Sequence, residues 1–314
     1  MTKKIALLRE LSKDQIKKIK EIAPSYQLVK GIEDEDKKEI EIVFGWNNEL
    51  KDWIENAGEQ LNWIQYVYAG VNHLPLDLLK KKEIKLTSGS GSNARAVAES
   101  TMAVVLGFSR NIVKAVREQE KRNWFIPEKN IELRDKKIII VGAGKIGEEI
   151  GQLAKAFSMH TIGINRSGGK IPYMDEQYVQ NDLEKIIHQA DFIVNVLPVT
   201  EQTKKFFNHR FFSKMNETSI FINVGRGETV VTADLMKVLD KKEIAGAALD
   251  VFEEEPLPTN HPLWTYDNVI ITPHIAGNVE DELENVFPLF LENLAAYVQS
   301  EDFPHNKIDW EQGY

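Results

Sequence analysis

The sequence contains no cysteine in its 314 residues. This absence excludes disulfide bonds, thiolate nucleophiles and cysteine-ligated zinc, and it is typical of a protein in a reducing compartment. Long apolar runs are missing as well, because no segment approaches the roughly 18 apolar residues of a membrane helix. The apolar run at residues 5–8 is too short for a signal peptide. We therefore expect a cytoplasmic protein that has no membrane partner.

Acidic residues outnumber basic residues in the chain. The chain has 39 Lys and Arg against 48 Asp and Glu, which gives a net charge of −9. Surfaces that bind nucleic acid carry clustered Lys and Arg, so we expect no nucleic-acid partner. Apolar residues make up 42% of the chain and charged residues 28%, as in ordinary globular proteins. A length of 314 residues favours two domains.

Short apolar runs alternate with helical, lysine-rich stretches in the first part of the chain. We predict strands at 4–8, 40–44, 63–67 and 84–87. A helix is expected at 12–23, where Ser12 and Gln15 have the spacing of a capping box. Alternating strands and helices indicate a parallel sheet that is covered by helices on both faces.

A second alternation of strands and helices starts near residue 136. The apolar runs that we predict to be its strands are 137–141, 160–164, 192–196, 219–224, 246–249 and 269–272. Continuous apolar runs suit central strands that are buried on both faces. One long helix is expected at 97–120, between the two alternations, and another at 281–299 near the end of the chain.

A glycine-rich turn follows the first strand of this second alternation. It has the GxGxxG pattern, and its residues are Gly142, Gly144, Lys145, Ile146 and Gly147. A strand comes before the turn and a helix, expected at 148–157, comes after it, which is the setting that the dinucleotide-binding fingerprint requires. The first glycines allow the backbone to approach a pyrophosphate, and the third allows helix and strand to pack closely. We expect a nicotinamide dinucleotide to bind here.

The residues after the next strand bear on the choice of cofactor. NAD-binding proteins usually place Asp or Glu there, where the carboxylate accepts hydrogen bonds from the ribose 2′-hydroxyl. This chain instead has Asn165, Arg166 and Ser167. Arg166 and Ser167 can bind a 2′-phosphate through charge-assisted hydrogen bonds, and no carboxylate repels it. We therefore expect NADP(H) to be preferred, with NAD(H) as the alternative.

Three side chains at later strand-to-loop junctions have the chemistry to hold a carboxylate substrate and to pass it a proton. Arg226 can hold the carboxylate of the acid and reach its carbonyl through the planar guanidinium. His274 is the natural proton donor, because imidazole is the side chain that titrates near neutral pH. A neighbouring carboxylate, Glu255, would orient the ring and favour its protonated form. We expect no metal in this site.

The motifs that carry these residues resemble those of the D-isomer-specific 2-hydroxyacid dehydrogenase family. They are Asn-Val-Gly-Arg-Gly at 223–227, the segment 249–258 with three consecutive glutamates, and Thr-Pro-His-Ile-Ala-Gly at 272–277. Glu255 matches the catalytic position, so Glu253 and Glu254 are interpreted as solvated neighbours. The resemblance covers nearly the whole chain and implies an α/β fold of two doubly wound domains. A Rossmann dinucleotide-binding domain at 97–281 would be inserted into a flavodoxin-like substrate domain formed by 1–96 and 282–314, onto which the final helix returns.

The resemblance implies further contacts with the two ligands. Those with the cofactor would come from Val196, Leu197, Pro198 and Thr203, from Asp250 at the nicotinamide carboxamide, and from the backbone at Val224, Gly225, Ala276 and Gly277. Those with the substrate would come from Trp46, Ala69, Gly70 and Val71, together with Arg226 and His274.

Position 46 separates two expected substrates. Enzymes of the family that act on a phosphorylated acid have an arginine where this chain has Trp46, so a small acid of the glyoxylate or hydroxypyruvate type fits better. A packing role for Trp46 remains an alternative. D-3-phosphoglycerate dehydrogenase is the nearest other enzyme, and a dinucleotide-sensing corepressor of the same fold is the alternative from another class.

The resemblance also implies a homodimer. Its interface would be formed by the helix and arm at 97–127. Trp124, Phe125 and Ile126 would leave an exposed apolar cluster on a monomer, which favours burial against a second copy.

Overall fold

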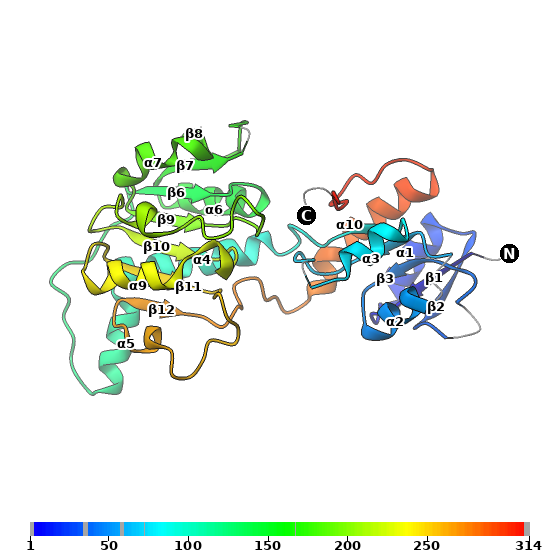
Figure 1. Ribbon diagram of the computed structural model, residues 1–314, viewed down its shortest axis with the longest axis horizontal. Helices are drawn as coiled ribbons and strands as arrows, with labels where there is room; N and C mark the ends of the chain where they lie inside the picture. Colours follow the sequence, from blue (N-terminus) through cyan, green and yellow to red (C-terminus); the bar gives the residue numbers. More distant parts are fainter. Residues whose placement is uncertain (1–2, 34–36, 57–59, 72, 167, 311–314) are drawn as a thin grey trace. The chain divides into compact units, whose positions relative to one another are not determined.

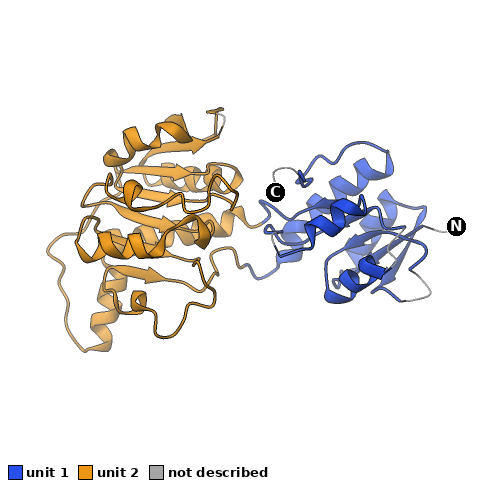
Figure 2. Ribbon diagram, in the orientation of Figure 1, with its two compact units in different colours: residues 1–92, 279–314 blue, residues 93–278 orange. Residues whose placement is uncertain are grey.

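The chain folds into two compact units, each with its own parallel sheet. The computed structural model describes residues 3–33, 37–56, 60–71, 73–166 and 168–310. Figure 2 shows the two units, which are residues 1–92 with 279–314 and residues 93–278. The chain passes between units after residues 92 and 278, a few residues before the boundaries at 96 and 281 that the sequence suggested.

The first unit contains a five-stranded parallel sheet in the order β2-β1-β3-β4-β5. This is the strand order of flavodoxin-like folds. The strands are β1 (Lys3–Leu7), β2 (Tyr26–Lys30), β3 (Ile40–Phe44), β4 (Trp63–Gln65) and β5 (Lys85–Thr87). The edge strand β2 was not predicted, because its residues are only partly buried and do not form an apolar run.

Four helices cover the sheet of the first unit. They are α1 (Lys13–Ile22), α2 (Asn48–Asn56), α3 (Leu76–Lys81) and α10 (Glu282–Val298). The predicted capping box at the start of α1 is confirmed, since Ser12 and Gln15 bond each other's backbone N–H. The return of the last helix to the first domain is also confirmed. Phe290 of α10 is fully buried, with its ring 4.6 Å from that of Phe44 and 5.6 Å from that of Trp63.

The second unit contains a seven-stranded parallel sheet in the order β12-β11-β10-β9-β6-β7-β8 (Figure 1). Its strands are β6 (Lys137–Val141), β7 (His160–Asn165), β8 (Glu176–Val179), β9 (Phe192–Asn195), β10 (Ile220–Asn223), β11 (Gly246–Leu249) and β12 (Val269–Ile271). The order reverses between β6 and β9, as in a Rossmann fold. Ligands bind such sheets at the carboxyl ends of the strands beside this reversal.

Alternate residues of the central strands pack into two cores, one on each face of this sheet. In β6, Ile139 and Val141 enter one core while Ile138 and Ile140 enter the other, because successive side chains of a strand point to opposite faces. The helices of the unit are α4 (Ala94–Ser109), α5 (Ile112–Glu120), α6 (Lys145–Ala156), α7 (Leu183–Ile186), α8 (His209–Phe212) and α9 (Thr232–Asp240). Among the described residues, no helix is both long and apolar enough to cross a membrane.

The single helix predicted at 97–120 is wrong, because the structure has two helices, α4 and α5. The chain turns at Asn111, whose φ is +53°. Asparagine adopts this left-handed conformation more readily than most residues. The Asn111 amide also donates to the carbonyl of Lys129 and to the side chain of Asn130, which holds the turn in place.

Candidate active site

The glycine loop after β6 has the backbone geometry expected of a dinucleotide site. Gly142 has a φ of +94°, and a Cβ there would lie 2.9 Å from the backbone nitrogen of Leu197. A Cβ on Gly144 would meet nothing within 4 Å, so the space beside the start of α6 is open. A Cβ on Gly147 would lie 3.1 Å from Ile140 of β6. Gly142 therefore allows a tight turn, Gly144 leaves the approach to the helix N-terminus open, and Gly147 allows the helix and the strand to pack closely.

The end of β7 carries no carboxylate. Asn165 closes the turn that follows, since its side chain accepts from the N–H of Gly168 and donates to the carbonyl of Gly169. Arg166 is exposed to solvent, and Ser167 lies outside the described residues. The first acidic residue after β7 is Asp175, whose carboxylate bonds Lys155 and Thr161 instead of facing this turn.

The loop after β9 is closed by the hydroxyl of Thr203. This hydroxyl donates to the carbonyl of Pro198 (2.6 Å) and accepts from the N–H of Thr200 (2.7 Å). Val196 and Leu197 are buried. The start of this loop, at Val196 and Leu197, is therefore buried, and the Thr203 side chain stabilises the residues that follow.

His274 and Glu255 form a hydrogen-bonded pair. The Nδ1 atom of His274 lies 2.7 Å from one carboxylate oxygen of Glu255, and the other oxygen accepts from the N–H of Phe252 (2.9 Å). The side chain of His274 is half exposed, and its Nε2 atom has no hydrogen-bond partner among the described residues. The pair therefore presents Nε2 to solvent while the carboxylate fixes the ring.

Asp250 holds the loop that carries His274. Its carboxylate is buried and accepts hydrogen bonds from the hydroxyl of Thr272 and from the N–H groups of Ile275 and Ala276. Its backbone carbonyl accepts the N–H of His274 (2.8 Å). His274 has a φ of +55°, a conformation that costs a residue other than glycine on the order of 1–3 kcal/mol. The four bonds to Asp250 offset this cost.

Arg226 lies in the turn between β10 and the short 3-10 helix η3 (Gly227–Thr229). The guanidinium donates to the carbonyl of Gly225 (2.7 Å). Burial lowers the pKa of the Arg226 guanidinium, while the carboxylates of Glu255 and Glu228 act in the opposite direction. Arginine nevertheless stays charged at neutral pH. The structure thus places a cation close enough to Glu255 to interact electrostatically with the His274–Glu255 pair.

Gly227 allows the Arg226 turn to press against the loop that carries Glu255. A Cβ at position 227 would lie 1.8 Å from the carbonyl oxygen of Phe252, a distance that no side chain can occupy. Because the N–H of Phe252 bonds Glu255, this contact joins the two loops.

The remaining predicted residues divide between the two units. Val224, Gly225, Ala276 and Gly277 follow β10 and β12 in the second unit. Trp46 follows β3 in the first unit and packs at the edge of its core, and Ala69, Gly70 and Val71 follow β4.

Three of the buried polar residues in the second unit lie next to the Arg226 turn and were not predicted as site residues: Asn195, Asn223 and Thr229. The segments that end at Asn195 and Asn223 are Phe-Ile-Val-Asn and Ile-Phe-Ile-Asn. The same polar residue at the carboxyl end of two apolar strands is a pattern that could have identified the two asparagines.

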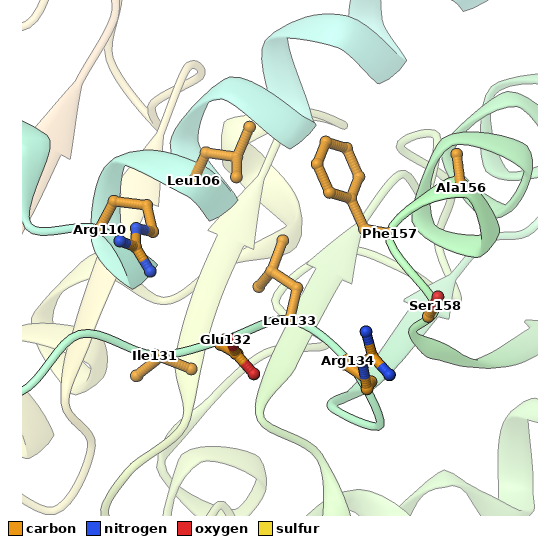
Figure 3. A pocket seen from close by; sticks show the side chains of 9 residues that line it. All are labelled: Leu106, Arg110, Ile131, Glu132, Leu133, Arg134, Ala156, Phe157 and Ser158. Carbon is orange, nitrogen blue, oxygen red and sulfur yellow. The ribbon is translucent and has the colours of Figure 1, made fainter.

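Figure 3 shows a separate pocket of about 290 Å³ in the second unit. Its lining includes Leu106 and Arg110 at the end of α4, residues 131–134 before β6, and Phe157 after α6. None of the predicted site residues lines it. The segment before β6 lies at the amino end of that strand, so the pocket is at the opposite edge of the sheet from the glycine loop.

The strand order and the glycine loop at the carboxyl edge of the second sheet are those of a dinucleotide-binding domain. Residues 102–276 match the family model described as D-isomer specific 2-hydroxyacid dehydrogenase, NAD binding domain. A glyoxylate reductase of Aeropyrum pernix is 31% identical over 260 residues, which are 80% of this chain and 77% of that protein. The chain therefore belongs to the D-isomer-specific 2-hydroxyacid dehydrogenase family.

One further relative and one solved structure are similar to this chain. A D-3-phosphoglycerate dehydrogenase of Methanocaldococcus jannaschii is 29% identical over 95% of this chain and 58% of its own length. The crystal structure of a D-isomer specific 2-hydroxyacid dehydrogenase from Xanthobacter autotrophicus, in complex with NADPH and MES, covers all of both chains with 22% identity and a TM-score of 0.84. This last likeness shows that the fold is shared.

We expect Asp250→Asn to destabilise the His274 loop. The substitution places an amide donor among three hydrogen-bond donors, which should lower the free energy of unfolding by about 1–3 kcal/mol. Urea denaturation measures the change. Glu254→Gln is the matched control, because Glu254 is exposed, and it should change stability by less than about 0.5 kcal/mol. Equal stability of the two variants would mean that the carboxylate does not hold the loop.

Proposed function

We propose that this protein reduces a small 2-oxo acid of the glyoxylate or hydroxypyruvate type to the corresponding D-2-hydroxy acid. The observation that carries the proposal is the His274–Glu255 pair, with a separation of 2.7 Å, beside the charged Arg226. These groups supply a proton donor, its orienting carboxylate and a cation for an acid substrate. The family of the chain supports this reaction type.

Each residue of the proposed reaction has a separate task. Arg226 binds the substrate carboxylate and polarises its carbonyl. A dihydronicotinamide cofactor, held by the glycine loop after β6, would supply the hydride for carbon 2. His274, with Nδ1 held by Glu255, donates the Nε2 proton to the carbonyl oxygen, so a 2-oxo acid, a hydride and a proton become a 2-hydroxy acid. In the oxidation direction Nε2 takes the proton back.

The cofactor is proposed to bind along the carboxyl edge of the second sheet. The open space beside Gly144 and the donors at the start of α6 suit a pyrophosphate. The proposed contacts are Gly142, Gly144, Lys145, Ile146, Gly147, Asn165, Arg166, Ser167, Val196, Leu197, Pro198, Thr203, Val224, Gly225, Asp250, Ala276 and Gly277. The exposed Arg166 and the missing carboxylate after β7 support a preference for NADP(H) over NAD(H).

The substrate contacts in the first unit remain a prediction. They are Trp46, Ala69, Gly70 and Val71. The tryptophan at position 46 favours a small acid over 3-phosphoglycerate, because an indole offers a phosphate no positive charge. The alternatives are D-3-phosphoglycerate dehydrogenase and, from another class, a dinucleotide-sensing protein that binds the cofactor without turnover.

The segment 97–127, which contains most of α4, all of α5 and the arm after it, is proposed to form a homodimer interface. Four apolar side chains in this segment are largely exposed: Ile112 (55%), Val116 (52%), Trp124 (90%) and Ile126 (75%). Exposed apolar residues that gather on one segment indicate a protein–protein contact. The cytoplasm remains the predicted location of the protein.

The first test is a steady-state screen of small 2-oxo acids. We expect turnover of glyoxylate and hydroxypyruvate with NADPH, and much slower oxidation of 3-phosphoglycerate. His274→Gln should lower kcat by about 10²–10⁴-fold, the usual contribution of a general acid, while NADPH binding is kept. His188→Gln, at an exposed histidine, is the control. Tight cofactor binding without turnover of any acid would instead support the sensing protein.

The second test concerns the cofactor. We expect Arg166→Ala to lower kcat/KM for NADPH by at least about tenfold, because it removes a charge-assisted hydrogen bond to the 2′-phosphate. The value for NADH should change by less than about twofold. Arg134→Ala, at an exposed arginine beside the pocket of Figure 3, is the control. A wild-type kcat/KM that is higher with NADH than with NADPH would contradict the proposal.

The third test concerns assembly. We expect the wild-type protein to sediment as a dimer, and the double substitution Trp124→Glu with Ile126→Glu to give monomers, because it places charges in an apolar interface. Sedimentation velocity measures both. Tyr173→Glu, which changes an exposed aromatic residue elsewhere, should leave the dimer intact. A monomeric wild-type protein would disprove the interface.

A further inference from the structure

Three polar side chains are buried together behind the turn that carries Arg226. Asn195 at the end of β9 and Thr229 at the end of η3 are 0% exposed, and Asn223 at the end of β10 is 1% exposed. Buried polar groups are costly unless each has a hydrogen-bond partner. The partners of these three residues therefore show what the group does.

A chain of hydrogen bonds connects the loop after β9 to the backbone of Arg226. The N–H of Leu197 donates to Oδ1 of Asn195 (3.0 Å). The Asn195 amide nitrogen then donates both to Oδ1 of Asn223 (2.8 Å) and to the hydroxyl of Thr229 (2.7 Å). Because Leu197 donates to one side of the Asn195 amide, the other side must be the nitrogen, and the orientation of the amide is settled.

The side chains of Thr229 and Asn223 donate to the same acceptor, the carbonyl oxygen of Arg226. The Thr229 hydroxyl donates to the carbonyl of Arg226 (2.6 Å), and the Asn223 amide nitrogen donates to that same oxygen (3.3 Å). Oδ1 of Asn223 also accepts from the N–H of Gly225 (3.1 Å). The backbone on each side of the Arg226 side chain is therefore fixed by buried groups, which sets the direction in which the guanidinium leaves the turn.

The glycine loop after β6 and the Arg226 turn both pack against the backbone of Leu197. A Cβ on Gly225 would lie 2.8 Å from the Leu197 carbonyl oxygen, and a Cβ on Gly142 would lie 2.9 Å from the Leu197 nitrogen. The glycine loop, the loop after β9 and the Arg226 turn thus meet without intervening side chains. A displacement of Leu197 would reach Asn195 and, through it, the Arg226 carbonyl.

We propose that Asn195, Asn223 and Thr229 are positioning residues that aim Arg226 at the carboxylate of the substrate. The inference rests on the proposed function, because it takes Arg226 to be the carboxylate-binding group. None of the three residues touches the reacting atoms. Asn195 and Asn223 also bond the backbone of Leu197 and Gly225, which are proposed cofactor contacts. The Thr229 hydroxyl donates to the Arg226 carbonyl alone, so its removal should weaken binding of the acid and leave binding of the cofactor nearly unchanged.

Thr229→Val tests the network with little change in side-chain shape. It removes the hydroxyl that bonds the Arg226 carbonyl, and we expect the KM for glyoxylate and the Kd for oxamate to rise about tenfold. The KM for NADPH should change by less than about twofold. Thr229→Ser keeps the hydroxyl, so its KM for glyoxylate and its Kd for oxamate should both lie within about threefold of the wild-type values. Thr229→Ala, measured in parallel, removes the hydroxyl without adding a methyl group towards Asn195 and should give the same result as valine.

Thr101→Val is the matched control. Thr101 is also 0% exposed, and its hydroxyl donates to the carbonyl of Val97 within α4 (2.8 Å), remote in sequence from the Arg226 turn. The substitution removes an equally buried bond, so it should lower thermal stability and leave both KM values unchanged. A merely structural role for Thr229 would give this same pattern.

The outcomes separate the inference from the proposed function. An active wild-type protein whose glyoxylate KM is unchanged in Thr229→Val and Thr229→Ala overturns the inference and leaves the function standing. An equal rise in the KM for NADPH also overturns it. A wild-type protein that neither turns over 2-oxo acids nor binds oxamate overturns both. The positioning role is supported if the KM for glyoxylate and the Kd for oxamate rise in Thr229→Val while the KM for NADPH does not, and if Thr229→Ser restores both values.

Discussion

The backbone of Phe252 is the contact on which the candidate site depends. The Phe252 carbonyl lies so close to Gly227 that no side chain fits at that position, and the Arg226 turn therefore packs against Phe252. The N–H of Phe252 donates to the carboxylate of Glu255. One peptide segment therefore sets both the position of the cation and that of the carboxylate that orients His274. Backbone is well suited to this task, since Phe252 is buried in the loop after β11 and its packed main chain has little room to move.

The left-handed turn at His274 shows how the fold stabilises a conformation that a histidine does not prefer. The conformation is supported by Asp250, which is buried at the end of β11 and bonds the loop through both its carboxylate and its carbonyl. A charged group is costly to bury, and three donors to the carboxylate make its burial tolerable. The same bonds fix the direction of the imidazole. Stability and reactivity at this edge thus rest on the same residue.

The sequence predicted the central parts of the molecule better than its margins, for physical reasons. Strands such as β6 and β10 are apolar throughout because they are buried on both faces. The edge strands β2 and β8 are only partly buried, so their residues alternate or are polar, and neither was predicted. The helix break at Asn111 depends on side-chain bonds to residues 129 and 130, which no local pattern contains. The GxGxxG loop was predictable because the approach of a backbone to a pyrophosphate restricts the residue types there. The pairing of His274 with Glu255 was expected from the resemblance to the family, because chemistry alone does not choose among three consecutive glutamates.

The buried network behind Arg226 explains why two asparagines occupy strand ends that packing alone would fill with apolar residues. An aliphatic side chain at position 195 would leave the Leu197 N–H without its acceptor and the Asn223 and Thr229 side chains without their donor. Each lost bond in a buried site costs more than the same bond contributes at the surface. An arginine that is proposed to bind a substrate from a turn needs this kind of support, because a small rotation of the backbone displaces the end of its long side chain much further.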